Sequence, residues 1–392
     1  MIHFFGGQGI GWALDEDLNR ARQALVGQIH EGSFACSPLI HSAWWPPLLQ
    51  VGAASLKGKS VLCFADNPPA FYLTRPGFEQ AAARVDLWIA RSQEAVRQFR
   101  ELGLPVALVP YTIDPQVFYP LAEEERRRIR ADLGLMEGDF VVGNFHRDSL
   151  ERDLSLPKVQ KGPDLFIDLV EKARESIPSL KVLLAGPRRH WLRGELTRRG
   201  IPFVFVGTLL ESDDFLVNVL PREHLNRLYA ALDCVLISSR WEGGPYAALE
   251  SIFAGRPVIS TRVGMSADLL GEYLYDTPSE GVDLLAQIER EGVNVSSLRQ
   301  AALVSHSSEA LASALLNAYA GISRKGSSLP EAAKTFFSLG LSRVHQTFRK
   351  SLGRHEGVSA VMEAVRRKNS GNSPIIKEAV SIAEAEAAIQ SS

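Results

Sequence analysis

Residues 232–264 read LDCVLISSRWEGGPYAALESIFAGRPVISTRVG, which predicts a strand, a loop, a helix, a tight turn and a second strand. Pro245 suits the first turn of the helix, where a missing N–H costs nothing. Gly255 follows the helix and can adopt a positive φ there. Pro257 then opens the next strand, where an absent backbone donor is tolerated. This stretch is therefore expected to form a β-α-β unit.

Short apolar runs alternate with helical patterns along most of the chain, which is typical of parallel sheets covered by helices. The strands expected in the first third are Ile2–Phe5, Phe34–Ile40, Ser60–Phe64, Val85–Ala90 and Val106–Val109. A second series is expected at Phe140–Asn144, Lys181–Ala185, Phe203–Val206, Cys234–Ile237 and Pro257–Ser260. Helices are expected at Ser92–Leu102 with Ser92 as N-cap, Pro163–Glu175, Glu223–Ala231, Pro245–Ala254 and Ser307–Ile322.

The segment Tyr111–Pro120 contains several prolines and no periodicity, so it is interpreted as an ordered linker. We therefore expect an α/β fold with an N-terminal domain over residues 1–115 and a second domain over 116–325. Residues 326–392 are expected to be a helical extension that could return to the first domain. Ala332–Leu352 has weak helical periodicity. The Ala/Glu/Ser-rich end, Asn369–Ser392, is expected to be helical at best, with disorder as the alternative.

Composition excludes several classes of protein. The 392-residue chain has a net charge of −2, so no global basic field draws it to nucleic acid or to an anionic membrane. The basic stretch Arg188–Arg199 is interpreted as a solvated helix face. No apolar run reaches the length of a membrane span, and the N-terminus lacks the pattern of a signal peptide. A cytoplasmic location is predicted, and peripheral contact with the inner face of a membrane stays open.

The chain has 3 cysteines, too few and too scattered for a disulfide framework or a zinc site. Cys63 and Cys234 lie in apolar runs and are expected to be buried hydrophobes. Asp15-Glu16-Asp17 has the D-x-D pattern of metal-dependent transferases. It sits at an expected helix start, where acidic residues favour the helix dipole, and does not follow an apolar strand. No metal and no cofactor are therefore expected.

The helix that begins near Pro245 is expected to start outside the carboxyl end of a strand, where open α/β sheets bind ligands. Free N–H groups and the positive end of the dipole favour an anion such as a diphosphate. Gly243 and Gly244 allow close approach to the backbone. Glu250, about one and a half turns into the helix, can accept from both hydroxyls of a ribose. Glu242 would reach the other end of the ligand.

The pattern of Glu242, seven residues and Glu250, followed by AGRPVIS, resembles the signature of retaining GT-B glycosyltransferases of family 4. The resemblance covers Val106–Ile322 and implies two Rossmann-like domains with a cleft between them. It further implies that Glu250 binds the nucleotide ribose and that Glu242 contacts the donor sugar. The loop between them would supply backbone donors to sugar and phosphate: Gly243, Gly244, Pro245 and Tyr246.

Upstream, Lys161-Gly162 leads into an expected helix and resembles the helix start where this family grips the donor diphosphate with a basic pair. Lys161 is a compact cation that can neutralise charge growing on the leaving group. The resemblance implies an arginine shortly after the preceding strand. Arg147 is our choice, Arg152 competes with it, and Lys158 is a weaker rival to Lys161.

Further residues match the family more loosely. Gly186, after a strand, falls where the family places a loop near the nucleotide base. Gly6 and Gly7 follow the first strand, and a loop of this kind often faces the cleft in the family. The glycines of this loop do not form a dinucleotide fingerprint, because Trp12 stands where a third glycine is needed.

His41, followed by Trp44 and Trp45, is the best-placed histidine to lie near a donor sugar. The alternative is a structural histidine among core tryptophans. Asp66-Asn67 also ends an expected strand, and turn chemistry explains that pair equally well.

Together these features predict a metal-independent hexosyltransferase that moves a sugar from a nucleotide-diphosphate-sugar donor. The resemblance implies that the reaction retains the anomeric configuration. The acceptor would be a glycan, a lipid-linked molecule or a small molecule, and the oligomeric state stays open. Two alternatives use the same fold: a catalytically silent binding or scaffold protein, which the short N-terminal domain favours, and a sugar-nucleotide epimerase. A Rossmann oxidoreductase ranks last because the glycine fingerprint is broken.

Overall fold

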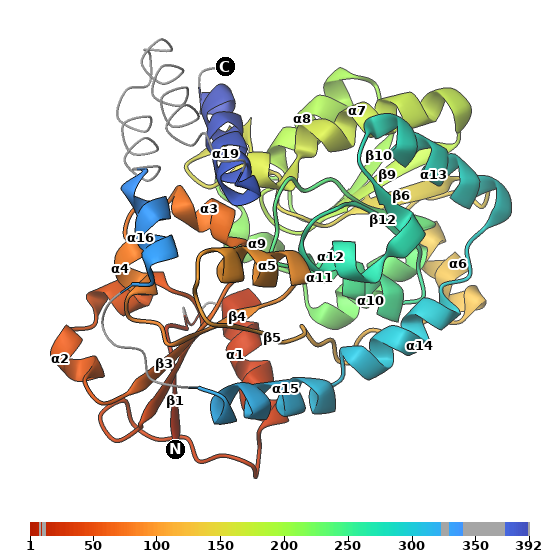
Figure 1. Cartoon of the computed structure of the whole chain (residues 1–392). Helices are drawn as coiled ribbons and strands as arrows, with labels where there is room; N and C mark the ends of the chain where they lie inside the picture. Colours follow the sequence, from red (N-terminus) through yellow and green to blue (C-terminus); the bar gives the residue numbers. More distant parts are fainter. Residues whose placement is uncertain (8, 10–12, 323–328, 340–372, 391–392) are drawn as a thin grey trace. The chain divides into compact units, whose positions relative to one another are not determined.

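The computed structural model describes residues 1–7, 9, 13–322, 329–339 and 373–390 (Figure 1). The chain divides into two compact units, Met1–Thr112 with Ser308–Ser392, and Ile113–Ser307. Each unit contains a parallel sheet flanked by helices. The α/β two-domain fold expected from the sequence is therefore confirmed.

The sheet of the second unit has six strands in the order β10-β9-β6-β11-β12-β13, all parallel. The chain moves outward from β6 to β9 and β10, then returns to the other side of β6 and continues through β11 to β13. The order therefore reverses between β6 and β11, where open α/β sheets bind ligands. The strands are β6 (Phe140–Asn144), β9 (Leu180–Ala185), β10 (Phe203–Val206), β11 (Cys234–Ile237), β12 (Val258–Thr261) and β13 (Leu274–Tyr275).

One face of this sheet packs against α7 (Pro163–Ser176), α8 (His190–Arg198) and α13 (Pro278–Glu291). Alternate strand residues such as Val142, Val182 and Leu236 point into that core, as expected from the period of two in a strand. The other helices of the unit are α6 (Glu123–Asp132), α9 (Phe215–Asn218), α10 (Arg222–Ala231), α11 (Tyr246–Phe253), α12 (Gly264–Leu269) and α14 (Ser296–Ser305), with short 3₁₀ turns η2 (Val159–Lys161) and η3 (Gly271–Tyr273).

The sheet of the first unit has five parallel strands in chain order, with no reversal. The strands are β1 (Ile2–Phe5), β2 (Leu39–Ser42), β3 (Ser60–Phe64), β4 (Leu87–Ala90) and β5 (Val106–Leu108). On one face Phe4, Leu62 and Ile89 share a core with α1 (Ala13–Ala24) and α15 (Ser308–Ala320).

The opposite face of the first sheet packs through aromatic rings. Trp88 points away from its neighbours on β4 and stacks on Phe99 at 5.0 Å between ring centroids, with Phe78 at 5.6 Å. The helices that follow the strands here are α3 (Pro69–Leu73), α4 (Phe78–Ala82) and α5 (Gln93–Glu101), and η1 (Pro46–Gln50) and α2 (Ala53–Leu56) lie between β2 and β3.

Most expected strands and helices are confirmed to within a few residues. Ser92 caps α5 by accepting a hydrogen bond from the Ala95 N–H at 3.2 Å. Cys63 and Cys234 are buried. The expected strand at Phe34–Ile40 was wrong in its first half, because a turn begins at Ser33, whose carbonyl accepts from the Ser37 N–H.

The sequence also missed a hairpin of two antiparallel strands, β7 (Ser149–Leu150) and β8 (Asp153–Pro157). These strands are short and carry polar or charged residues, so they lack the apolar run by which the other strands were found. The hairpin lies between β6 and α7 in the second unit.

The end of the chain packs on the first unit. We expected Ser307–Ile322 in the second domain, but α15 lies against α1, where Leu311 and Leu315 join Leu18 in one core (Figure 1). In the region Ala332–Leu352, α16 (Glu331–Ser338) covers the first part, and residues 340–352 lie outside the described residues.

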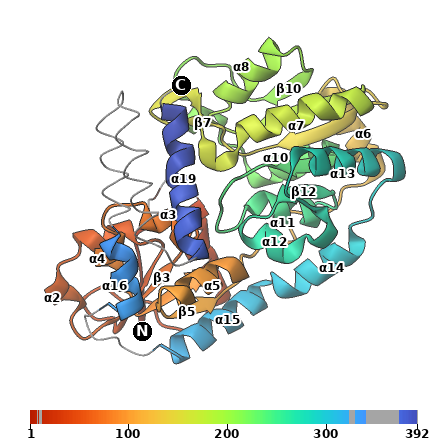
Figure 2. The ribbon, with the colours of Figure 1, turned by 45° about the horizontal axis from the view of Figure 1, so that its top comes forward.

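The last described segment is a helix, α19 (Pro374–Gln390), that packs against α3 (Figure 2). It buries Ile375, Ile376, Val380 and Ile382. Disorder was the alternative expected for this segment from the sequence, because it has few large apolar side chains. The few that exist recur at helical spacing, which is enough for one buried face.

A close contact between two elements generates a first prediction. Gly162 is the N-cap that precedes α7 and has φ 55°, and a Cβ built there would lie 2.0 Å from the carbonyl oxygen of Ser238, the residue after β11. Gly162→Ala should therefore lower the free energy of unfolding, measured with urea, by more than the roughly 1–3 kcal/mol of a strained backbone position alone. Gly134→Ala is the control, because Gly134 has φ 69° and nothing within 4 Å of its Cβ position. Equal losses in the two variants would contradict the close contact.

Candidate functional site

The loops that follow β6 and β11 meet at the reversal of the second sheet. The two strands are parallel neighbours, with Cys234 beside Val142 and Val235 beside Gly143. Parallel neighbours end at the same edge of a sheet, so the segment after β6, including Arg147, lies beside the loop that leads from β11 to α11. The residues predicted from the family resemblance in the second unit lie on or near these loops.

Glu242 and Lys161 form an ion pair, although 81 residues separate them. The Glu242 side chain is only 7% exposed, and its carboxylate also accepts from the Ser239 hydroxyl at 2.8 Å. A buried carboxylate is tolerated only with partners of this kind. The structure therefore brings together two of the predicted site residues.

Two hydrogen bonds to backbone carbonyls of η2 hold it against the β11–α11 loop. The Arg240 N–H donates to the Gln160 carbonyl at 2.8 Å, and the Ser238 hydroxyl donates to the Lys161 carbonyl at 3.1 Å. The Arg240 guanidinium binds both carboxylate oxygens of Asp164 in the first turn of α7. These contacts set the position of Lys161 relative to the loop.

The glycine-rich loop packs against the start of α12. The Gly243 carbonyl accepts from the Met265 N–H at 3.3 Å, and a Cβ on Gly264 would lie 2.5 Å from that carbonyl oxygen. Gly244 and Tyr246 are half-buried. Pro245 is the N-cap rather than the first helical residue, with ψ 113°, and no side chain caps α11. The helix start therefore lacks a side-chain acceptor of its own.

Glu250 lies inside α11 and is 8% exposed. The Tyr229 hydroxyl donates to its Oε2 at 2.8 Å, and the Arg222 guanidinium lies 3.4 Å from its Oε1. The Tyr229 ring packs edge-on against Phe145, with 4.9 Å between centroids, and burial together with the Glu250 charge raises its pKa. The Glu250 carboxylate is thus held in one direction and does not point into bulk solvent.

Sequence reasoning missed both partners of Glu250. Tyr229 and Arg222 lie in the expected helix before β11, but nothing in their spacing distinguishes them from other core or surface residues of that helix.

Arg147 lies next to this site and is partly buried, whereas its rival Arg152 is exposed at the hairpin turn. The Arg147 guanidinium lies over the Phe215 ring, 5.8 Å from its centroid. Burial, with the neighbouring Arg188, lowers its pKa from the usual value. Of the two arginines, Arg147 is the one whose charge interacts with that of Glu242.

The interpretation of Arg188–Arg199 as a solvated face was wrong for its first two residues. Arg189 is fully buried, and its guanidinium donates to the Asp148 carboxylate at 2.6 Å and to the Asn144 carbonyl at 2.7 Å. Arg188 binds Asp213 at 2.7 Å. A charge run gives no sign of which members face the interior, because the partners here come from other strands and loops.

Gly186 also lies at this edge of the sheet. It follows β9 with φ 88°, and the nearest atom to its Cβ position is the Phe145 carbonyl oxygen at 3.9 Å. Gly186 therefore lies next to the loop that follows β6.

The remaining predicted residues belong to the first unit. Gly6 has φ 78°, and its carbonyl accepts from the Trp44 indole at 3.1 Å. The Cβ position of Gly7 lies 3.0 Å from the Asp15 carboxylate, which accepts from the Gly9 N–H. Residues 8 and 10–12 of this loop lie outside the described residues.

His41 is fully buried in the first unit. Its Nδ1 lies 2.7 Å from the Tyr319 hydroxyl, and its ring packs against Phe64 with 4.3 Å between centroids. Burial lowers its pKa well below the usual value, so the ring is neutral. The contacts of His41 therefore support the structural alternative, and its place near a donor sugar stays a prediction.

The acidic residues of the first unit also have structural partners. The Asp66 carboxylate accepts from the Tyr72 hydroxyl at 2.6 Å and from the Asn67 amide at 3.1 Å. Asp17, of the D-x-D pattern, pairs with buried Arg91 at 3.4 Å.

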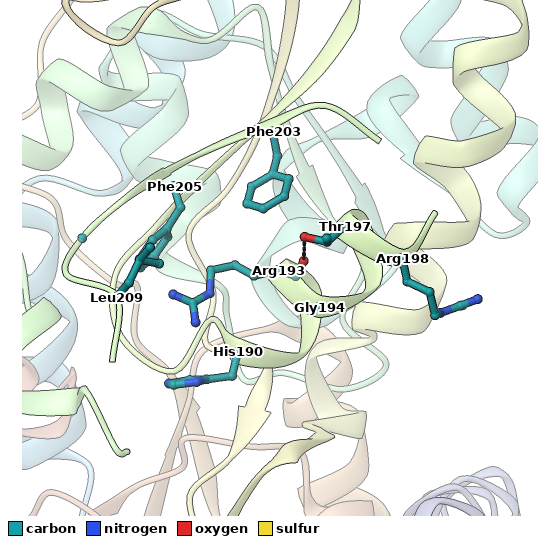
Figure 3. Close-up of a pocket in the computed structure, with 9 residues that line it drawn as sticks. His190, Arg193, Gly194, Thr197, Arg198, Phe203, Phe205 and Leu209 are labelled. Atoms are coloured by element: carbon teal, nitrogen blue, oxygen red, sulfur yellow. Dashed lines mark hydrogen bonds between the residues drawn. The ribbon is translucent and has the colours of Figure 1, made fainter. Parts of the chain in front are cut away.

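A pocket of about 800 Å³ lies elsewhere in the second unit, between α8 and the edge strand β10 (Figure 3). Arg193 lies over the Phe205 ring in this pocket, 4.7 Å from its centroid. Phe203, Phe205 and Leu209 supply apolar surface. None of the predicted site residues lines it, and β9 and β6 separate β10 from β11. The pocket is therefore distinct from the site at the reversal of the sheet.

Within the described residues, no helix has the length and apolar character needed to cross a membrane.

Comparison with known proteins gives a consistent result. Residues 154–320 match a family model described as "Glycosyl transferases group 1". The lipopolysaccharide core biosynthesis mannosyltransferase LpsB of Rhizobium meliloti is 27% identical over 196 residues, which is 48% of each chain. A D-inositol 3-phosphate glycosyltransferase of Nocardiopsis dassonvillei is 27% identical over 231 residues, 56% of this chain and 50% of the relative. The chain thus spans about half the length of the curated relatives it matches.

Among solved structures, Anabaena Alr3699/HepE in complex with UDP-glucose superposes with a TM-score of 0.62 at 17% identity, over 81% of this chain and 99% of that one. At this identity the likeness establishes the fold, which is GT-B. The match over residues 154–320 confirms the expected resemblance to GT-B glycosyltransferases at the level of group 1.

The contacts of Glu250 lead to a prediction about stability. Tyr229→Phe removes one donor from a buried carboxylate, which should lower the free energy of unfolding in urea by about 1.5–3 kcal/mol. Tyr275→Phe is the matched control, because the hydroxyl of that buried tyrosine donates to the neutral Ile237 carbonyl at 2.9 Å. The control should lose only about 0.5–1.5 kcal/mol. A smaller loss for Tyr229→Phe than for the control would show that the bond to Glu250 is not stabilising.

Proposed function

We propose that this chain is a glycosyltransferase that moves a hexose from a nucleotide-diphosphate-sugar to an acceptor, with retention of configuration. The observation that carries the proposal is the position of two buried, partnered glutamates, Glu242 and Glu250, before and within α11 at the reversal of the second sheet. The relatives and the structural neighbour support the donor class: one is a mannosyltransferase, one a glycosyltransferase, and HepE was solved with UDP-glucose.

In this proposal Glu250 binds the ribose of the donor. Its carboxylate has two oxygens with about four acceptor positions, and the two donors found here leave capacity for the hydroxyls of a ribose. Tyr229 and Arg222 would fix the direction of the carboxylate before the donor arrives, which lowers the ordering entropy of binding.

The start of α11, Lys161 and Arg147 would hold the diphosphate. Negative charge grows on the diphosphate as the bond to the sugar breaks, and cations placed in advance stabilise that charge in the transition state. Lys161 is bound to Glu242 in the free protein. On donor binding its ammonium would share its three N–H donors between Glu242 and phosphate.

Glu242 would orient the donor sugar from the opposite end of the loop. We propose that these cations act without a metal ion. Retention follows from the family resemblance, which also suggests a glycan, lipid-linked or small-molecule acceptor. The cytoplasmic location stays a prediction.

The test of donor binding is a thermal-shift screen against UDP-glucose, GDP-mannose and ADP-glucose, because a ligand that binds the native state raises its stability. The donor found in this way is then titrated into Glu250→Ala. Loss of charge-assisted bonds to the ribose should weaken binding by about 1.5–3 kcal/mol, which is roughly ten- to 150-fold.

Glu289→Ala is the matched control, because Glu289 lies exposed on α13 of the same unit. Glu250→Gln separates loss of charge from loss of packing. Unchanged donor affinity in both Glu250 variants would defeat the ribose assignment.

A turnover assay tests the reaction itself. Lys161→Met should lower kcat for donor hydrolysis without acceptor by about 10²–10³, since one preorganised charge-stabilising group of the transition state is lost. Lys181→Met is the control, because Lys181 lies on β9 and pairs with Asp139 at 2.8 Å.

The same assay separates the alternatives. A silent binding protein would release no sugar at all, and an epimerase would convert the sugar nucleotide without releasing it, which NMR detects. Either result in the unmodified protein would overturn the transferase proposal.

A further inference from the structure

Lys158 is a half-buried lysine at the edge of the proposed diphosphate site. It directly precedes η2, and its carbonyl accepts from the Lys161 N–H at 2.8 Å. In a 3₁₀ turn, positions three residues apart lie on the same side. The two lysines are therefore expected to present their side chains to the same space.

The Lys158 ammonium has no carboxylate within ion-pair distance in the part of the chain that the structure describes, whereas the neighbouring Lys161 and Arg188 do. Lys161 binds Glu242, and Arg188 binds Asp213 and Glu151. The Glu242 carboxylate acts on both lysines, but its ion pair is with Lys161.

The residues beside Lys158 supply no further counter-charge. Its own N–H donates to the Asp148 carbonyl, but the Asp148 carboxylate is bound by buried Arg189 at 2.6 Å. His146 is half-buried, and desolvation together with the cations Lys161, Arg189 and Lys158 lowers its pKa well below the usual value, so it is neutral. The charges that act most strongly on Lys158 are three cations, Arg147, Lys161 and Arg188, and one carboxylate, Glu242.

Burial, followed by the charges of Arg147 and Lys161, lowers the pKa of Lys158 from 10.5 to about 7, and Glu242 acts in the opposite direction. The surroundings of Lys158 therefore disfavour its charged ammonium form and would favour a bound anion. An anion brought next to it would raise the pKa again.

We propose that Lys158 is a third cation of the donor diphosphate site and that it takes up a proton when the sugar nucleotide binds. This inference rests on the proposed function and adds a pH-dependent residue to the same site. Lys161 is then the lysine already paired before binding, and Lys158 is the lysine that acquires its partner with the donor.

The direction of the pH dependence follows from this assignment. In the free protein Lys158 is protonated below about pH 7 and neutral above it. In the complex two negative phosphates keep it protonated to a higher pH. Donor binding should therefore take up almost no proton at about pH 6 and roughly one proton at about pH 8, and the affinity should fall about tenfold across that range.

The experiment is isothermal titration calorimetry on the full chain with UDP-glucose, or with GDP-mannose or ADP-glucose if one of these gives the larger thermal shift. Each titration is done at pH 6 and pH 8 in two buffers that differ in ionisation enthalpy, which yields the number of protons taken up. The two phosphates of such a donor are fully ionised at both pH values, so they take up no proton themselves.

Two variants separate charge from structure. Lys158→Met should bind more weakly at pH 6 and take up no proton at either pH. Lys158→Arg keeps a permanent charge, so it should bind equally well at both pH values and exceed the unmodified protein at pH 8. Lys181→Met, on β9, should keep the proton uptake of the unmodified protein.

Proton uptake and pH dependence that persist in both Lys158 variants would overturn the inference while leaving the proposed function intact. Failure of the unmodified protein to bind any of the three sugar nucleotides would instead overturn the proposed function. Thermal unfolding of Lys158→Met checks that the variant is folded, and Lys158→Arg decides the question if it is not.

Discussion

The geometry of the second unit depends on how two carboxylates are kept away from water. Glu242 and Glu250 are 7% and 8% exposed, and a charge in such surroundings persists only with partners at hydrogen-bond distance. Lys161 of η2 is the charged partner of Glu242, and Tyr229 of α10 is the buried donor to Glu250. Because each partner comes from a different element, the two pairings also fix the loop before α11 and the helix itself.

Positive charge gathers where the sheet order reverses. The loop after β6 carries Arg147, the hairpin after it leads to Lys158 and Lys161, and the uncapped start of α11 adds the positive end of a helix dipole. The buried pair of Arg189 and Asp148 ties the first of these loops to the start of α8. Four sources of positive potential thus meet at the reversal of the second sheet, and together they make this edge of the sheet attractive to an anion.

The first unit is built from both ends of the chain. Leu18 of α1 and Leu311 of α15 share one core, and α19 packs against α3. One face of the sheet therefore depends on α15, a helix that begins about two hundred positions after the last strand of that sheet. His41 lies in that core and is bound to Tyr319 of α15, and these contacts support a structural role for the histidine.

The sequence by itself determined the β-α-β unit of residues 232–264, most of the strands, and the motif formed by Glu242 and Glu250. These features follow from apolar periodicity, capping and turn residues, which act over a few positions. Only the tertiary structure decided that Tyr229 supports Glu250, that Arg188 and Arg189 are buried, and that α15 belongs to the first unit. These outcomes depend on contacts between residues far apart in the chain, and no local pattern encodes which distant group will neutralise a buried charge. For the same reason no local pattern shows that, within the described residues, the Lys161 ammonium has a carboxylate at ion-pair distance and the Lys158 ammonium has none.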